Sequence, residues 1–393
     1  MNGRLHYVDG LRVFAFAILL TYHSSVAFFP DMKWLIESPQ TSADIALAMD
    51  FPRAWRLALL FFVSGMGTWF AFKSVSGFTF LKERTVRLLL PLLFAMTVVI
   101  VPQVWYERMY EDGYSGSLLT FWVTRYFTEG KYPDGNFTWA HMWFVAYLLV
   151  MSFVCYPVFR FLGQPRGRRL TQLFERIAGS DAIYLFFLVP LGLNLALTPF
   201  FPRQTNALYN DGAWFATWAT WFGFGFLVAR HHAALIGAII ARRWISAGIA
   251  TVLTVFLYDH AWTGGGLQIG SYDNETPLFK VALFALAWSM ILTLIGFAAL
   301  HFNRRSETLT WLNRMIFPLY IVHQTVTVAA LYYVVPLDIP LAAKYGAVLF
   351  STVFLSLGFA VAADRLPWPF RALFGLPDNA SRIQTGERQT MRS

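Results

Sequence analysis

Residues 276–300 read TPLFKVALFALAWSMILTLIGFAAL, and Lys280 is the one charged side chain among them. A helix needs roughly 20 predominantly apolar residues to cross the hydrocarbon core of a bilayer. This stretch is long and apolar enough to do so, and nine others along the chain resemble it. We therefore predict an all-α fold, a polytopic transmembrane helix bundle with about ten spans: 8–29, 54–72, 86–106, 139–160, 181–200, 212–229, 244–260, 276–300, 316–336 and 342–363.

The composition argues against a soluble globule. Hydrophobic residues make up 57% of the chain and charged residues 13%, whereas charged residues account for about a quarter of an ordinary soluble protein. The net charge of +9 does not indicate a nucleic-acid partner, because the basic residues stand in short clusters between apolar runs. Cys155 is the single cysteine, so it forms no intrachain disulfide or cysteine metal cluster. We expect no metal and no permanently bound cofactor.

Lysine and arginine indicate on which side of the membrane each loop lies, because positively charged loops are retained in the cytoplasm. They concentrate in alternate loops, as at Arg168 and Arg169, and in the C-terminal tail. The pattern predicts both termini in the cytoplasm, with segments 30–53 and 107–138 on the opposite side as the longest outer loops. We expect a transmembrane domain over 1–365 and a cytoplasmic tail over 366–393, which is polar enough at its end to be partly disordered.

The first predicted span carries three ionisable side chains, Asp9, Arg12 and His23. Such groups are costly inside a bilayer, so each is a candidate for function. Arg12 and His23 are eleven residues apart, close to three helical turns, and therefore share one face. An imidazole there can take a proton from an attacking hydroxyl or carry an acyl group. The alternative is that His23 only hydrogen-bonds another helix. Asp9 either orients Arg12 by an ion pair or caps the start of the span.

Two arginines, Arg84 and Arg87, stand one turn apart at the start of the predicted third span and face the same side of a helix. Two guanidinium groups in that arrangement can hold phosphates by bidentate hydrogen bonds, with help from the positive end of a helix. The alternative is a positively charged anchor on the cytoplasmic side, which explains most arginine pairs at the ends of spans.

Two further segments combine histidine with an aromatic side chain. His141 and Trp143 open the predicted fourth span, and Tyr320 and His323 are i, i+3 neighbours in the ninth. We take these four residues as candidates for substrate binding. They are equally suited to polar contacts between helices, and for His323 that interpretation weighs slightly more than a direct catalytic role.

Taken together, five motifs occur in a characteristic order: Asp9-Gly10-Leu11-Arg12 with His23, Phe61-Phe62-Val63-Ser64-Gly65, Arg84-x-x-Arg87 with Pro91, His141-x-Trp143, and Tyr320-x-x-His323. In the order of these motifs the chain resembles the acyltransferase-3 family. Within that family it most closely resembles the bacterial proteins that succinylate or otherwise acylate periplasmic glucans. One departure is Leu148, which stands where many members have Glu seven residues after the histidine of the fourth span.

The resemblance implies a membrane-bound O-acyltransferase of the bacterial inner (plasma) membrane. Such an enzyme moves an acyl group (acetyl, succinyl or similar) from cytoplasmic acyl-CoA to a hydroxyl of a cell-envelope glycan or glycolipid at the periplasmic face. It implies that His23 and Arg12 are catalytic, and we add Asp9 to them as the candidate ion-pair partner of Arg12. It also implies that Arg84 and Arg87 bind the CoA phosphates while the pantetheine arm passes between helices. The expected partners are acyl-CoA, the envelope acceptor and membrane lipid, with no nucleic acid.

Two other classes of protein remain open. A transporter or flippase for a lipid-linked glycan also places histidine and arginine inside a membrane. The absence of an inverted repeat and of paired broken spans in the sequence argues against that class. A glycan polymerase needs long charged outer loops, whereas the longest loops here have about 30 residues.

Overall fold

The computed structural model describes residues 5–30, 32–75, 77–264 and 276–377. The chain forms two compact units that alternate along the sequence. The first unit comprises Met1–Leu19, Leu47–Lys82 and Tyr147–Thr310, and the second comprises Leu20–Ala46, Glu83–Ala146 and Trp311–Ser393. The predicted disordered end of the tail, from residue 378 onward, lies outside the described residues.

Helices make up the secondary structure, as predicted. Among the described residues no strand forms, and an isolated bridge joins Lys131 to Phe137. In the described part of the chain, seven helical segments are long and apolar enough to cross a membrane: His6–Phe28, Ala43–Ser74, Gly77–Glu111, Arg243–Trp262, Pro277–His301, Glu307–Val334 and Leu341–Arg365. The total rises to ten, as predicted, if each of three bent helix pairs counts as one span. The chain is therefore a multi-pass membrane protein.

The three bent pairs were not expected from the sequence. They are Ala140–Val154 with Tyr156–Gly163, bent by 43°, Pro165–Ala178 with Asp181–Leu197, bent by 100°, and Gly212–Arg230 with His232–Ala241, bent by 104°. Pro157 explains the first break, because proline supplies no backbone N–H to the preceding turn. At the second break the hydroxyl of Ser180 accepts a hydrogen bond from the backbone N–H of Ala182 and starts the next helix. Above, the lack of paired broken spans in the sequence counted against a transporter. The three bent pairs show that this premise is wrong.

In the first unit, α2 (Ala43–Ser74) crosses α10 (Gly212–Arg230) at very short range. A Cβ atom on Gly65 would lie 1.9 Å from the carbonyl oxygen of Phe222, and one on Gly225 would lie 1.8 Å from the carbonyl oxygen of Phe62. Glycine at both positions lets the two backbones touch, as small residues do at helix contacts in membranes. The glycine of the Phe-Phe-x-Ser-Gly motif is thus explained by packing.

Other helices of the first unit complete its core. The ring of Trp221 on α10 stacks on Trp288 of α13 (Pro277–His301) with centroids 5.7 Å apart. On its other side α13 packs against α12 (Arg243–Leu257) through Leu257 and Leu286. The first unit also contains α7 (Tyr156–Gly163), α8 (Arg168–Ala178), α9 (Leu188–Leu197) and α11 (His232–Ala241), together with parts of helices that continue into the second unit.

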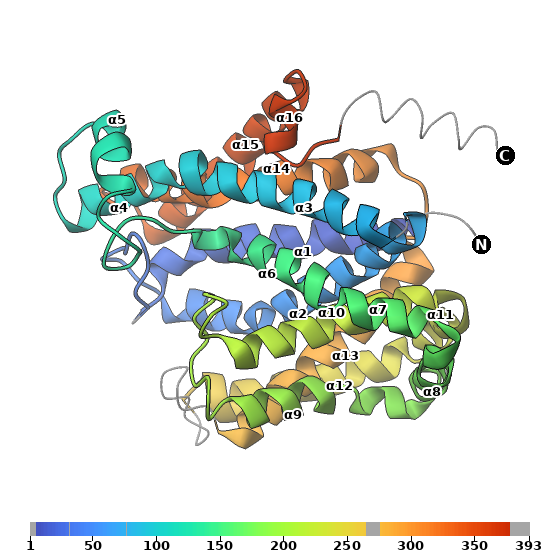
Figure 1. Ribbon diagram of the computed structural model, residues 1–393. Coiled ribbons are helices and arrows are strands. Elements are labelled where there is room, and N and C mark those ends of the chain that lie inside the picture. Colours follow the sequence, from blue (N-terminus) through green and yellow to red (C-terminus); the bar gives the residue numbers. More distant parts are fainter. Residues whose placement is uncertain (1–4, 31, 76, 265–275, 378–393) are drawn as a thin grey trace. The chain divides into compact units, whose positions relative to one another are not determined.

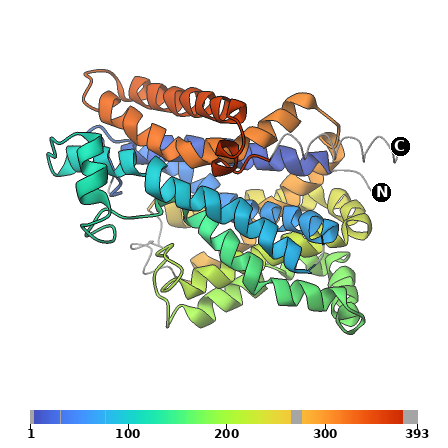
Figure 2. The ribbon, with the colours of Figure 1, turned by 45° about the horizontal axis from the view of Figure 1, so that its top comes forward.

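In the second unit, α14 (Glu307–Val334) and α15 (Leu341–Arg365) lie side by side (Figure 2). The hydroxyls of Thr327 and Thr352 hydrogen-bond across them at 3.0 Å. Val328 and Val348 join a buried cluster with Phe28, which follows α1 (His6–Ser25). This core fixes the position of α14 against the end of α1.

A long helical segment of the second unit runs through α3 (Gly77–Phe94), a π-helical turn at Ala95–Val99, and α4 (Val101–Glu111), with the short α5 (Leu118–Phe121) beyond it (Figure 1). Two carbonyls of the π-helical turn accept hydrogen bonds from side chains: Met96 from the hydroxyl of Tyr126 at 2.8 Å, and Val99 from that of Thr325 at 2.7 Å. A π-helical turn inside an α-helix often marks a functional region. Here it leads directly into α4.

Candidate active site

Two histidines from opposite ends of the sequence form the centre of the site. Nδ1 of His23, near the end of α1, lies 2.9 Å from Nε2 of His323 on α14. Their rings are parallel to within 5° and stack with centroids 5.1 Å apart. The two residues are 300 positions apart in the chain, so only the packing of α1 against α14 brings them together.

The hydrogen bonds of this pair determine which ring nitrogens carry protons. Nδ1 of His323 lies 2.6 Å from the backbone carbonyl oxygen of Tyr320. A carbonyl can only accept, so this nitrogen carries the hydrogen. In the neutral ring Nε2 of His323 then accepts a hydrogen bond from Nδ1–H of His23. That assignment leaves Nε2 of His23 as the unprotonated, basic nitrogen.

His141 and Tyr320 lock the 3-10 turn Ala140–Met142 onto α14 by two reciprocal hydrogen bonds. Nε2–H of His141 donates to the carbonyl oxygen of Ile321 at 3.0 Å, and the hydroxyl of Tyr320 donates to the carbonyl oxygen of His141. The ring of His141 also meets that of His323 edge to face, with centroids 5.0 Å apart. The turn therefore packs against His323 as well as against the backbone of α14.

Burial separates the four polar residues into two groups. His323, His141 and Tyr320 are 0%, 5% and 8% exposed, whereas His23 is only partly buried. Trp143, the fourth candidate for substrate binding, is half-buried at the start of α6 (Trp143–Val154) and contacts the cluster through Phe144, whose ring lies 6.2 Å from that of Tyr320. His23 is thus the residue of the cluster best placed to meet a ligand.

The other two predicted catalytic residues, Asp9 and Arg12, belong to the first unit. A guanidinium nitrogen of Arg12 lies 3.5 Å from Oδ1 of Asp9, one turn earlier on α1. Asp9 is buried, at 5% exposed, and Arg12 lies against Gly67 of α2. The ion pair considered from the sequence is therefore present.

Arg84 and Arg87 lie one turn apart on α3, as predicted. The helix begins at Gly77, however, about two turns before Arg84. The field of a helix terminus is largely confined to its first turn, so the positive helix end cannot assist this pair, contrary to expectation. Arg87 is exposed and Arg84 is partly buried. Any phosphate bound here would be held by the two guanidinium groups alone.

Beside the histidine cluster the second unit contains a cavity of about 580 Å³. Ala140 and Gln324, the chain neighbours of His141 and His323, line it at one side. Gln103 and Glu107 of α4 line it at another and are only 1% and 2% exposed.

Gln103 and Glu107 are not among the residues predicted from the sequence, because Gln103 lies near the end of the predicted third span and Glu107 in the predicted outer loop. Polar residues at 103, 107 and 111, four apart, were the available signal for one polar helix face.

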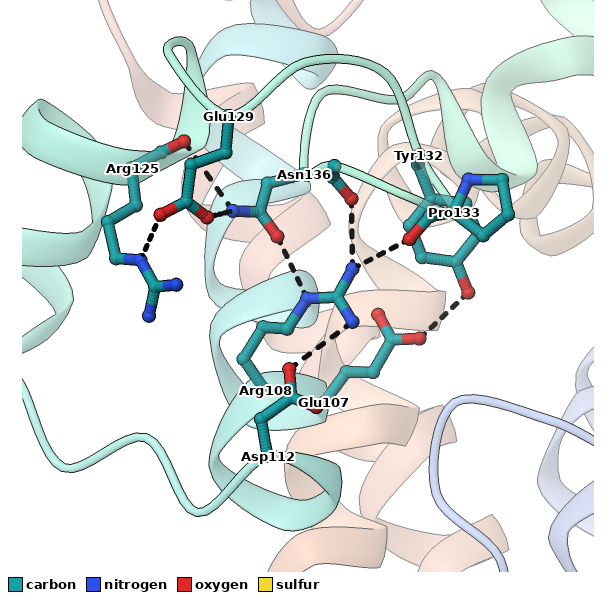
Figure 3. Close-up of polar contacts among 9 residues, drawn as sticks. Glu107, Arg108, Asp112, Arg125, Glu129, Tyr132, Pro133 and Asn136 are labelled. Carbon is teal, nitrogen blue, oxygen red and sulfur yellow. Dashed lines mark hydrogen bonds and ion pairs between the residues drawn. The ribbon is translucent and has the colours of Figure 1, made fainter.

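Arg108 holds the loop that closes this cavity (Figure 3). Its guanidinium donates to Oδ1 of Asn136 at 2.8 Å and to the carbonyls of Pro133 and Gly135 at 3.1 and 2.9 Å. The loop thereby presents Tyr132, whose hydroxyl donates to Oε1 of Glu107 at 2.7 Å. Burial, together with the nearby carboxylate of Glu107, raises the pKa of Tyr132 above its ordinary value, so this hydroxyl keeps its proton and remains a donor.

Comparison with known proteins agrees with the arrangement of the motifs. A sequence model described as "Acyltransferase domain", that of the acyltransferase-3 family, matches residues 5–362. The proteins named "Glucans biosynthesis protein C" from Escherichia coli O139:H28 (strain E24377A / ETEC) and from Escherichia coli (strain K12) are 21% and 20% identical to this chain. Each alignment covers 85% of this chain and 84% of the relative. No solved structure shows a significant match. Because the family model spans nearly the whole sequence, the chain belongs to the acyltransferase-3 family of membrane acyltransferases.

Proposed function

We propose that this protein is an O-acyltransferase that uses acyl-CoA as donor and acylates a hydroxyl of a cell-envelope glycan or glycolipid, with His23 as general base. The observation that carries the proposal is the chain of hydrogen bonds from His23 through His323 to the carbonyl of Tyr320. It gives a partly exposed imidazole one basic nitrogen and a fixed orientation. Family membership supplies the class of reaction.

In the proposed reaction, Nε2 of His23 takes the proton of the acceptor hydroxyl as its oxygen attacks the thioester carbonyl. The tetrahedral intermediate then collapses, the carbon–sulfur bond breaks, and the departing thiolate takes the proton from the imidazolium. The products are an ester and free CoA, and His23 returns to its starting state. His323 accepts from Nδ1–H of His23 throughout and stabilises the transient positive charge, so it is a positioning residue.

On the donor side, Arg84 and Arg87 would bind the CoA phosphates from the cytoplasm. Two guanidinium groups one turn apart match the bidentate geometry of phosphate. The pantetheine arm would then pass between helices to bring the thioester to His23. Arg12, held by Asp9, remains a predicted catalytic residue on the strength of the family resemblance.

On the acceptor side, the relatives named for glucan biosynthesis suggest a glucan or a related sugar-containing molecule. We place this chain in the bacterial inner membrane, with both termini in the cytoplasm and the loop of residues 112–139 on the periplasmic side. That orientation rests on the distribution of lysine and arginine among the loops.

Mass spectrometry of envelope glycans tests the proposal most directly. A strain lacking this protein should lose one acyl mass from one class of envelope glycan, and the complemented strain should regain it. A strain complemented with His23→Ala should resemble the deletion. Glycan profiles that are identical in the deletion strain and its complemented parent would refute the proposal.

A flippase for a lipid-linked glycan is the second candidate, and the three bent helix pairs favour it. In reconstituted vesicles a flippase would move labelled lipid-linked glycan across the bilayer without acyl-CoA. An acyltransferase would release CoA only when donor and acceptor are both present. The hydrogen-bonded histidine pair has an obvious use only in acyl transfer.

A further inference from the structure

The cavity beside the histidine cluster contains two buried acceptor atoms that no protein group satisfies. Among the described residues, Oε2 of Glu107 and Oε1 of Gln103 have no hydrogen-bond partner. Both side chains line the cavity and are more than nine-tenths buried. Leaving such an atom unsatisfied costs about 1–3 kcal/mol, and more for a charged group, so the arrangement is suited to a ligand that brings hydrogen-bond donors.

The charges around the cavity do not favour an anionic ligand. Lys33 and Arg108 are balanced by Glu107 and Glu111, and the guanidinium of Arg108 is already engaged with the loop. A phosphate or carboxylate offers only acceptors and would face the two unsatisfied oxygens. The donor's phosphates therefore do not belong here.

Two aromatic residues complete the lining. Trp34 and Tyr132 border the cavity, and both are partly buried. Aromatic faces combined with a few placed polar groups are typical of sites for small molecules, which have volumes of about 300–1,000 Å³. A sugar ring fits this combination, because its C–H faces are apolar while its hydroxyls donate and accept at the edges.

We propose that this cavity binds the acceptor as an uncharged, hydroxyl-rich sugar. Oε2 of Glu107 and Oε1 of Gln103 each accept a hydrogen bond from a sugar hydroxyl, and these two residues determine specificity for the acceptor. Tyr132 donates to the other oxygen of Glu107 at 2.7 Å, so Oε2 is the carboxylate oxygen that remains for a sugar hydroxyl. The inference rests on the proposed function and adds to it the place and the chemistry of acceptor recognition.

Two nearly isosteric variants test it in the purified full-length protein. Glu107→Gln keeps Oε1 as acceptor for Tyr132 but replaces Oε2 by a donor, and Gln103→Met keeps the length of the chain without polar atoms. Glu107→Gln should raise the Kd for a linear glucose heptasaccharide, measured by titration calorimetry, by about tenfold or more, the value of a hydrogen bond to a charged group. Gln103→Met should raise the same Kd by about 2- to 12-fold, the value of a neutral hydrogen bond. The acceptor KM should rise in step, while kcat and the donor KM stay unchanged.

The matched controls are Glu307→Gln and Gln164→Met, because both residues are exposed and lie outside the cavity. They should bind the heptasaccharide as the wild type does. The thermal unfolding temperature of every variant separates a lost contact from a damaged fold. If Gln103→Met proves unstable, the Kd of Glu107→Gln alone tests the inference. Unchanged Kd values in stable cavity variants would overturn the inference, as would a wild type that does not bind the heptasaccharide.

The outcomes also separate this inference from the proposed function. A wild type that acylates the heptasaccharide while the cavity variants keep its Kd and KM overturns the inference and leaves the function standing. A wild type that binds the heptasaccharide through Glu107 and Gln103 but releases no CoA overturns the function and leaves the binding site standing.

Discussion

The hydrogen bond between His23 and His323 leads to the most specific prediction. Replacing His323 by leucine removes the acceptor for Nδ1–H of His23 and leaves the ring free to change its tautomer. The bond matters most when His23 has taken up the proton and is positively charged. A hydrogen bond to a charged group is worth about 1.5–3 kcal/mol, against about 0.5–1.5 kcal/mol for a neutral one. The difference of about 1–1.5 kcal/mol corresponds to a fall in kcat of about 5- to 15-fold.

The assay is the release of CoA by purified protein at saturating donor and acceptor. His23→Ala alone should lower kcat by about 10²- to 10⁴-fold, the usual contribution of a general base. His323→Leu should lower kcat by about 5- to 15-fold and leave both KM values unchanged. His323→Gln, whose amide oxygen can still accept the hydrogen bond, should keep most of the wild-type kcat. In the His23→Ala background His323→Leu should have no further effect, because its partner is already absent.

Three results would refute this reasoning. Full activity of a stably folded His323→Leu variant would show that the hydrogen bond does not orient the base. An unchanged effect of His323→Leu when His23 is already alanine would show that His323 acts independently of His23. Full activity of His23→Gln would show that His23 is not the general base, since an amide cannot take up a proton at neutral pH.

The remaining predictions concern the donor, the topology and the packing of the first unit. Arg84→Ala and Arg87→Ala should each weaken CoA binding in titration calorimetry by about 10- to 150-fold. Arg87→Lys should insert into the membrane normally and yet bind CoA less well than the wild type. Lysine variants that bind CoA as the wild type does would indicate that the arginine pair is only a topological anchor. Reporters fused after Arg169 and at the C-terminus should report cytoplasm and one after Gly135 periplasm, so an external C-terminus would contradict the predicted orientation. Gly225→Ala should lower the unfolding temperature, because its Cβ would lie 1.8 Å from a backbone oxygen of α2 and overpacking costs about 1–3 kcal/mol. Gly223→Ala on the same helix meets nothing within 4 Å and should not lower it, whereas equal losses in both would refute the close crossing.

The candidate residues differ in how far sequence reasoning could reach them. His23, Arg84 and Arg87 stand out because an ionisable side chain in or beside an apolar run is costly wherever the helix lies. Gln103 and Glu107 did not stand out, since they were assigned to the end of a span and to an outer loop. Their significance depends on Tyr132, which lies in a loop 25 residues after Glu107 and takes up one of its carboxylate oxygens.

By itself the sequence determined the helical class and the approximate positions of the spans. The reason is local, because backbone groups in lipid must be satisfied within each segment and a run of about 20 apolar residues has few alternatives to a helix. Tertiary structure alone decided that three of the ten predicted spans correspond to bent helix pairs. It also decided that His23 meets His323 across 300 positions and that Nε2 of His23 is the basic nitrogen. These features arise from contacts between helices distant in the sequence, and no local pattern of apolar and charged residues encodes which helices will touch.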